Sequence, residues 1–189
     1  LFIDLTGFTG QSERLGPVRT RALLKTFHDL VDETASSHKG LVVNFMGDGA
    51  MVVFGALDPD PAKAENAVRA AGDLIVRTRD WIARDPELAG AGRALDVRIG
   101  AHSGPAILSR LGSDTNQQVT ATGDTVNVAS RLLAVASEAK ARLAVSADLL
   151  TAAGIVEPAG LFDERRTASI RGRSQPIAVW LTREPARLP

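Results

Sequence analysis

Residues 44–55 read "NFMGDGAMVVFG", an apolar stretch that is interrupted once, by Gly47, Asp48 and Gly49. The flanking residues have high β-propensity, and glycine and aspartate between two such runs indicate a tight hairpin turn. We therefore predict strands over 41–46 and 50–54, joined at this turn. Because an aspartate between two glycines is also an ordinary turn residue, the motif alone does not decide what the Asp48 carboxylate does.

Strands and helices alternate on both sides of the hairpin. "LFIDL" (1–5) predicts a short buried strand, and the glycine-rich "TGFTGQSERLGP" (6–17) predicts a loop or the start of a helix. Helical spacing of apolar residues predicts helices over 17–37, 59–83 and 123–137, with Asp124 or Thr125 as a cap of the last one. The remaining predictions are strands at 95–104, 105–113, 142–146, 162–172 and 176–182, a short helix at 146–154 and a loop at 83–94.

This order predicts an α+β fold. The first elements follow the order β-α-β-β-α-β of a ferredoxin-like split β-α-β core, with C-terminal strands added to it. We expect a sheet dominated by antiparallel pairs, with the helices packed on one face. Residues 1–189 are expected to form a single domain. Because Leu1 falls inside the first predicted strand, we expect the domain to be a fragment of a longer chain.

Composition narrows the range of functions. Hydrophobic residues make up 44% of the 189 residues, and the 22 Lys and Arg balance the 22 Asp and Glu. A net charge of zero gives no support for a nucleic-acid partner. The chain has no cysteine, which excludes disulfides, thiolate nucleophiles and cysteine-based zinc sites. No apolar run reaches the roughly 20 residues that span a bilayer. We expect a cytoplasmic domain, with membrane attachment through other segments left open.

Two carboxylates stand at the ends of apolar strands. Asp4 closes the first predicted strand and Asp48 lies at the hairpin turn. In a split β-α-β core the first strand lies beside the hairpin, so we expect the two carboxylates to converge on a site for Mg²⁺ or Mn²⁺. Backbone N–H groups of Gly7, Phe8 and Thr9, at a helix start, are suited to binding phosphates. Taken singly, either aspartate also fits a turn or cap.

Asn127 and Arg131 are four residues apart in the helix predicted over 123–137, so they share one helix face. A guanidinium beside a metal-bound triphosphate stabilises the charge of a phosphoryl-transfer transition state. An arginine on an amphipathic helix is more often simply solvated, and this alternative stays open on the sequence alone.

The chain resembles the catalytic domain of the class III nucleotidyl cyclases. The resemblance rests on five stretches that occur in the order found in the family: "FIDLTGFT", "VVNFMGDGAMVVFG", "VRIGAHSG", "TATGDTVNVASRL" and "SIRGRSQPIAVWL". It implies that the chain converts ATP to cyclic AMP and pyrophosphate, through attack of the ribose 3′-hydroxyl on the α-phosphorus. It also implies a homodimer whose sites are shared between subunits, and a regulatory domain elsewhere in the full-length chain.

The resemblance also implies roles for particular residues. Asp4, Asp48 and the Leu5 carbonyl would hold two ions of Mg²⁺ or Mn²⁺ in each site. Asn127 would orient the ribose and Arg131 would stabilise the α-phosphoryl transition state, and both would come from the other subunit. Phosphates would be bound by Arg171, in place of the usual lysine and with Arg173 as its neighbour, and more weakly by Arg98, because an arginine in a strand often faces solvent.

Two positions that would read the base depart from the common pattern. Asn44 occupies a position at which lysine is usual. At the second position the chain has Thr120, and in this it resembles a bacterial subclass of adenylate cyclases that has threonine at that position. Lysine only donates hydrogen bonds and so favours adenine, whereas an asparagine amide serves either base. We expect ATP to be favoured, and a guanylate or low-selectivity cyclase or an inactive nucleotide-binding and dimerisation module remain as alternatives.

Overall fold

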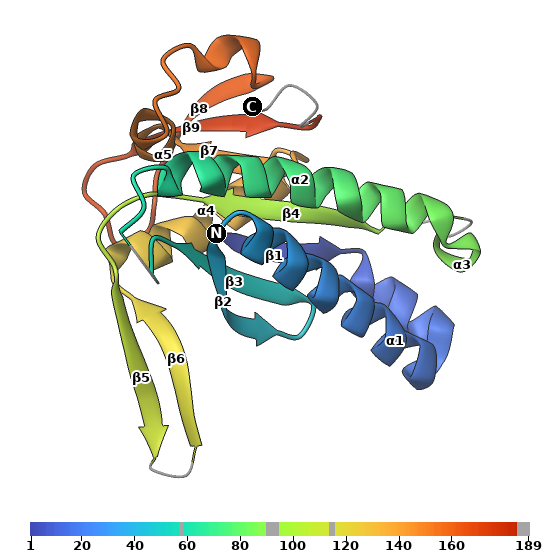
Figure 1. Ribbon diagram of the computed structural model, residues 1–189. Helices are drawn as coiled ribbons and strands as arrows, with labels where there is room; N and C mark the ends of the chain where they lie inside the picture. The colour runs from blue at the N-terminus through green and yellow to red at the C-terminus, as the bar shows by residue number, and fades with distance from the viewer. Residues whose placement is uncertain (57–58, 90–94, 114–115, 185–189) are drawn as a thin grey trace.

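The computed structural model describes residues 1–56, 59–89, 95–113 and 116–184, with the backbone alone at 89, 111–113 and 116–118. A seven-stranded sheet runs through it in the order β2-β3-β1-β4-β7-β9-β8. Every neighbouring pair of strands is antiparallel except β4 and β7. Figure 1 shows the helices lying along this sheet and a separate two-stranded arm, β5 and β6, that extends from one end. The predicted antiparallel-dominated α+β fold is confirmed.

The first half of the chain forms the predicted split β-α-β core. Its elements are β1 (Phe2–Thr6), α1 (Phe8–Ser37), β2 (Gly40–Met46), β3 (Gly49–Phe54), α2 (Lys63–Arg84) and β4 (Asp96–Ala101). β1 lies between β3 and β4 because the hairpin packs against the first strand. Helix α1 begins nine residues earlier than the predicted 17–37 and is kinked at Gly16, where φ is 72° and Pro17 follows.

The second half adds β7 (Leu143–Ser146), α5 (Ala147–Ala152), β8 (Glu164–Ala168) and β9 (Ile177–Thr182) to the β4 edge. The loop predicted over 83–94 contains the short helix α3 (Pro86–Ala89), and residues 90–94 lie outside the described part. The arm consists of β5 (Ile107–Ser113) and β6 (Asn116–Thr122), and sequence patterning missed β6. Its "NQQVTAT" lacks a continuous apolar run, because an arm that stands away from the core buries little side-chain surface.

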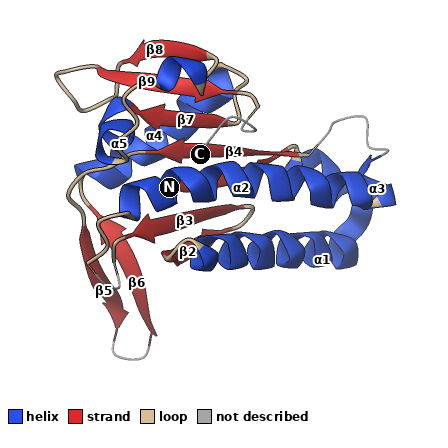
Figure 2. Cartoon of the chain, turned by 45° about the horizontal axis from the view of Figure 1, so that its top comes forward, coloured by secondary structure: helices blue, strands red, loops and turns tan. Residues whose placement is uncertain are grey.

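The helices cover both faces of the sheet, which corrects the expectation of one face. Val97, Ile99 and Ala101 of β4 join the core cluster that also contains buried residues of α1 and α2. Helix α4 (Asp124–Glu138) packs behind them, where Leu132 and Ala136 form a second cluster with residues of β7 and β9. Figure 2 shows α1 and α2 side by side on one side of the strands. None of the described helices is long and apolar enough to cross a membrane.

Gly100 is the point at which α4 comes closest to the sheet. A Cβ atom at this position would lie 2.4 Å from the Ala129 carbonyl oxygen and 2.4 Å from the Leu133 nitrogen. Both atoms belong to helix backbone, so only a shift of the whole helix relieves the clash.

We therefore expect Gly100→Ala to lower the free energy of unfolding by about 1–3 kcal/mol, the usual cost of overpacking. Chemical denaturation of the variant measures this effect. Gly10→Ala is the matched control, because a Cβ at that helical position meets nothing within 4 Å. Equal stability of the two variants would contradict the close packing of α4 on β4.

Candidate active site

Strand pairing brings Asp4 and Asp48 together. Asp4 pairs with Gly49 across β1 and β3, and the Leu5 N–H donates a 3.0 Å hydrogen bond to the carbonyl oxygen of Asp48. Both aspartates are half-buried. They line one cleft of about 550 Å³, together with Arg98 and the residues of the turn after β1. The structure confirms the prediction that these two carboxylates converge at the strand ends.

Burial and the neighbouring charges both act on the Asp4 carboxyl in this cleft. Burial raises the pKa of the Asp4 carboxyl above its ordinary value, and the negative charge of Asp48 raises that pKa further. The Arg98 guanidinium acts in the opposite direction. The cleft therefore holds two carboxylates whose repulsion is only partly compensated within the chain, which favours binding of an additional positive charge.

This donor set fits a hard divalent cation. Carboxylate oxygens and a backbone carbonyl are typical ligands of Mg²⁺, which commonly takes one or two carboxylates and completes its shell with water and substrate phosphates. In the described ranges no group of three or more His, Cys, Asp or Glu side chains is arranged to hold a metal. An ion here would thus be held by Asp4, Asp48 and the Leu5 carbonyl, with the remaining ligands supplied by substrate and water.

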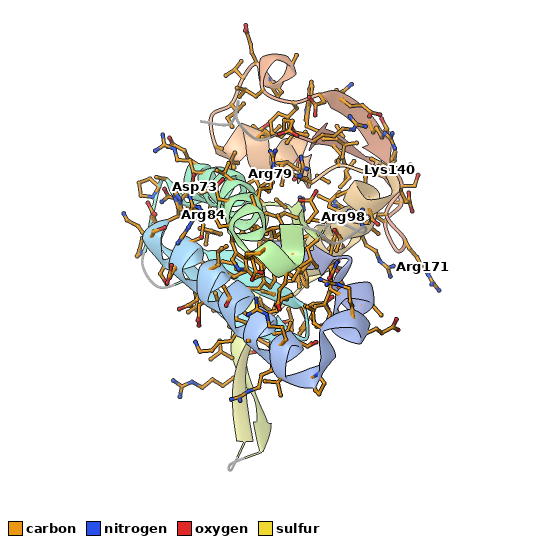
Figure 3. The ribbon with its side chains drawn as sticks, turned by 90° about the vertical axis from the view of Figure 1, so that its right-hand side faces the viewer. Asp73, Arg79, Arg84, Arg98, Lys140 and Arg171 are labelled. Carbon is orange, nitrogen blue, oxygen red and sulfur yellow. The ribbon has the colours of Figure 1, made fainter. Side chains whose placement is uncertain are left out.

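Arg98, predicted as the weaker of the phosphate-binding arginines, lies in this cleft. Its side chain is half-buried on β4, and Asp4 pairs with Arg98 in the strand register. Nη1 of Arg98 donates a 2.9 Å hydrogen bond to Oγ of Ser137 on α4. Figure 3 shows Arg98 nearer the middle of the molecule than Arg171, which projects from its periphery.

The turn after β1 supplies free backbone donors. Gly7 has a φ of 79° and no side chain caps the helix that starts at Phe8. The N–H of Gln11 makes the first intrahelical bond, to the Gly7 carbonyl, at 3.2 Å. The preceding N–H groups, including those of Phe8 and Thr9, have no intrahelical partner by helix geometry. They point from a helix N-terminus that lines the cleft beside the aspartates, an arrangement suited to an anion.

Asn127 and Arg131 lie elsewhere, on the exposed side of α4. Both side chains are exposed, whereas Val128 and Leu132 of the same helix are buried. Neither residue lines the cleft, and within the described residues neither side chain has a hydrogen bond or ion pair. One chain therefore presents the carboxylates and the Asn127–Arg131 pair on separate surfaces.

The start of α4 differs from the prediction. Gly123, with a φ of 131°, precedes the first turn, and no side chain caps it. Thr125 instead donates a 2.6 Å hydrogen bond to the carbonyl oxygen of Pro105. Asp124 forms an ion pair with Arg173 at 3.6 Å, so the neighbour of Arg171 already has a partner. The Arg171 guanidinium is exposed and has no partner in the part of the chain that the structure describes.

The two candidate base-reading residues lie on neighbouring elements. Asn44 is in β2, opposite Met51 of β3, just after an irregularity in the strand register. Thr120 is in β6, opposite Ser109 of β5. β2 and β6 are in contact, so the tertiary structure brings these strands to the same region of the molecule. Both side chains are half-buried.

Comparison with known families decides the identity of the fold. Residues 1–183 match the sequence profile of the family described as the adenylate and guanylate cyclase catalytic domain. The chain belongs to this family, the class III nucleotidyl cyclases. Its cleft carboxylates therefore lie in a cyclase catalytic domain, and domains of this family use divalent metal ions.

Relatives of the cyclase domain include enzymes named for either nucleotide. Adenylate cyclase 1 of Rhizobium meliloti is 36% identical over 132 residues, which are 70% of this chain and 20% of that protein. The cyclase domain thus spans about a fifth of that relative's length. The guanylyl cyclase Cya2 shares the fold, with a TM-score of 0.82 at 24% identity and coverage of 99% and 93% of the two chains.

A third relative provides an example of a dimer. It is a non-standard dimeric guanylyl cyclase domain, from the RhoGC fusion protein of Blastocladiella emersonii. It is 26% identical, covers 95% of this chain and 92% of its own, and has a TM-score of 0.70.

Sequence reasoning missed two side chains that contact residues in or beside the candidate site. Ser137 binds Arg98, and His28 on α1 contacts the turn that carries Asp48. Ser137 lies 39 residues from Arg98 along the chain, and His28 lies 19 residues from Gly47. No spacing or motif in the sequence marks these contacts, because each depends on how a helix packs against the sheet.

Proposed function

We propose that this domain is an adenylate cyclase that converts ATP to 3′,5′-cyclic AMP and pyrophosphate. The observation that carries the proposal is the cleft in which Asp4 and Asp48 meet beside Arg98, next to an uncapped helix N-terminus. Carboxylates for metal ions, a guanidinium and free N–H groups are together what a triphosphate requires. Membership of the cyclase family and the similarity to the Rhizobium adenylate cyclase support this assignment.

In the proposed reaction the ribose 3′-oxygen forms a bond to the α-phosphorus, the bond from that phosphorus to the β-phosphate oxygen breaks, and the 3′-hydroxyl proton passes to solvent. When bound, two Mg²⁺ or Mn²⁺ ions supply positive charge to the reacting oxygen and the phosphates. Asp4, Asp48 and the Leu5 carbonyl hold them. The N–H groups of the Gly7–Thr9 turn, with Arg98 and Arg171, bind phosphate oxygens. Asn127, which lies outside the cleft of its own chain, is proposed to orient the ribose from the second subunit of a homodimer.

Arg131 is proposed to stabilise the charge that develops on the α-phosphoryl group, but from the second subunit of a homodimer. Three features of one chain support this arrangement. Arg131 is exposed and unpaired within the described residues, it lies outside the cleft, and the β5–β6 arm exposes Ile107 and Val119. A two-fold dimer that brings α4 of one copy to the cleft of the other would complete two equivalent sites.

Guanylate cyclase activity is the second candidate, because Asn44 can pair with either purine and a 26% identical relative is a guanylyl cyclase domain. The experiment that separates the candidates is incubation of the purified domain with Mn²⁺ and either ATP or GTP, followed by identification of the products. Cyclic AMP as the main product supports the proposal. Cyclic GMP as the main product supports the second candidate. If neither product forms from either nucleotide, the remaining alternative is an inactive nucleotide-binding and dimerisation module.

Asn44→Lys tests the proposed role of residue 44 in reading the base. A lysine ammonium donates to adenine N1 but cannot accept from the N1–H of guanine, which is left unsatisfied. A buried unsatisfied donor costs about 1–3 kcal/mol, so we expect the preference for ATP over GTP to rise about five- to 150-fold.

The measurement is kcat/KM for both nucleotides in the parent and in the variant. Metal dependence is the internal control, because residue 44 lies in β2, before the turn, and does not line the metal cleft. An unaltered ATP/GTP ratio would show that Asn44 does not contact the base.

A further inference from the structure

The turn that carries Asp48 has few internal constraints. Gly47 and Asp48 form the two-residue connection between β2 and β3, and Gly47 has a φ of 63°. A positive φ confined to the first central residue is the pattern of a type II′ turn. A Cβ at Gly47 would meet nothing within 4 Å, so no surrounding wall holds this corner in place. Contacts from other elements must therefore fix where the Asp48 carboxylate points.

Helix α1 provides such a contact through His28. Its Nε2 lies 2.9 Å from the carbonyl oxygen of Gly47. Because a carbonyl only accepts, Nε2 carries the hydrogen and donates it. The His28 ring also stacks on Phe45, with ring centroids 4.2 Å apart and planes inclined by 24°. His28 thus contacts the hairpin on both sides of Met46, at the end of β2 and at the first residue of the turn.

The strand side of the turn is fixed separately. The Leu5 N–H donates to the carbonyl oxygen of Asp48 at 3.0 Å. Two consecutive carbonyl oxygens therefore accept hydrogen bonds from different elements. The Gly47 carbonyl accepts from His28 of α1, and the Asp48 carbonyl accepts from Leu5 of β1. With both bonds in place, the peptide groups on the two sides of the Asp48 Cα have a defined orientation, and this sets the direction of its Cα–Cβ bond.

We propose that His28 is a positioning residue for the metal site, which orients Asp48 toward Asp4 through the Gly47 carbonyl. This inference rests on the proposed function, because it gives Asp48 the role of a metal ligand. Partners that orient a ligand typically contribute 10- to 100-fold to metal affinity or activity. The stacking on Phe45 holds the ring, and the Nε2–H bond holds the turn.

The test separates the two contacts. His28→Phe keeps a planar ring against Phe45 but removes the donor, whereas His28→Gln keeps an N–H donor and removes the ring. Mn²⁺ binding is measured by electron paramagnetic resonance in the presence of 3′-deoxy-ATP, which lacks the reacting hydroxyl, so the readout does not depend on turnover. We expect His28→Phe to weaken Mn²⁺ binding about tenfold, and His28→Gln to restore most of it.

His38→Phe is the matched control. This histidine also joins α1 to another element, through a 2.7 Å contact with Asp73 of α2, but it does not touch the hairpin turn. Its variant should bind Mn²⁺ as the parent does. If His28→Phe lowers thermal stability, His28→Asn repeats the comparison with a polar side chain whose shorter reach withdraws the donor.

Parent-like Mn²⁺ binding by His28→Phe and His28→Asn would overturn the inference. Asp48→Asn in the same assay distinguishes the failures. If Asp48→Asn weakens binding and the His28 variants do not, only the role of His28 is wrong. If Asp48→Asn also binds Mn²⁺ like the parent, the metal site itself is wrong, and the proposed function fails with it.

Discussion

Asp48→Asn is expected to lower kcat/KM for ATP by at least about 100-fold and to leave the fold intact. The physical reason is that the amide keeps the shape of the side chain but removes one of the two negative charges that meet in the cleft. Loss of a group that stabilises charge in a transition state commonly costs about 10²–10³ in rate. The measurement is steady-state formation of cyclic AMP with Mn²⁺ present.

Stability provides the control for this variant. The Asp48 charge raises the pKa of Asp4, which means that the two ionised carboxylates repel one another in the folded chain. Removal of the Asp48 charge relieves its repulsion of the Asp4 carboxylate. We therefore expect an unchanged or slightly higher melting temperature. Parent-like turnover in a well-folded Asp48→Asn variant would remove the metal hypothesis.

Asp4→Ala and Arg131→Ala are each expected to be inactive alone and to regain activity when mixed. Asp4 lines the cleft, and Arg131 lies on the exposed side of α4, outside it. If the site is shared between subunits, one site of a mixed dimer lacks both Asp4 and Arg131. The other site has the intact Asp4 of one subunit and the intact Arg131 of the other. Random exchange makes about half of the dimers mixed, so about a quarter of the parent activity should return.

The mixing experiment needs proof that mixed dimers form. Affinity tags that differ between the two variants allow the mixed species to be isolated, and its activity is then compared with that of each pure variant. A mixture of two copies of the same variant, differently tagged, is the control for the effect of exchange itself. Isolated mixed dimers that remain inactive would show that the carboxylates and Arg131 do not act in one shared site.

Much of the fold is encoded in local patterns. The Gly-Asp-Gly sequence between two β-branched and aromatic runs predicted the β2–β3 hairpin, and the structure confirms it. The order of elements was sufficient to predict the split β-α-β core, because few topologies bury the faces of such a sequence. β6 escaped prediction since it lies in an arm away from the core and lacks the apolar pattern that burial imposes.

Packing on the second face was decided by tertiary structure. The stretch "VRIGAHSG" does not indicate that Gly100 lies against the backbone of α4. The helix can approach the sheet there because Gly100 has no side chain. The same approach brings Ser137 within hydrogen-bonding distance of Arg98 and holds that side chain at the cleft. The sequence supported Arg98 only as a weak phosphate-binding candidate, because a strand's own pattern does not show which helix packs beside it.

For the candidate site, the sequence by itself determined which groups are predicted to carry the chemistry. They are the carboxylates of Asp4 and Asp48, the glycine turn beside them, and the Asn127–Arg131 pair with its four-residue spacing. These follow from residue type and local spacing. Only the tertiary structure decided that the first two groups share one cleft, that Arg131 lies outside it, and that His28 contacts the turn before Asp48. The physical reason is that such contacts join residues far apart in the chain, and their geometry depends on strand register and on helix packing against the sheet.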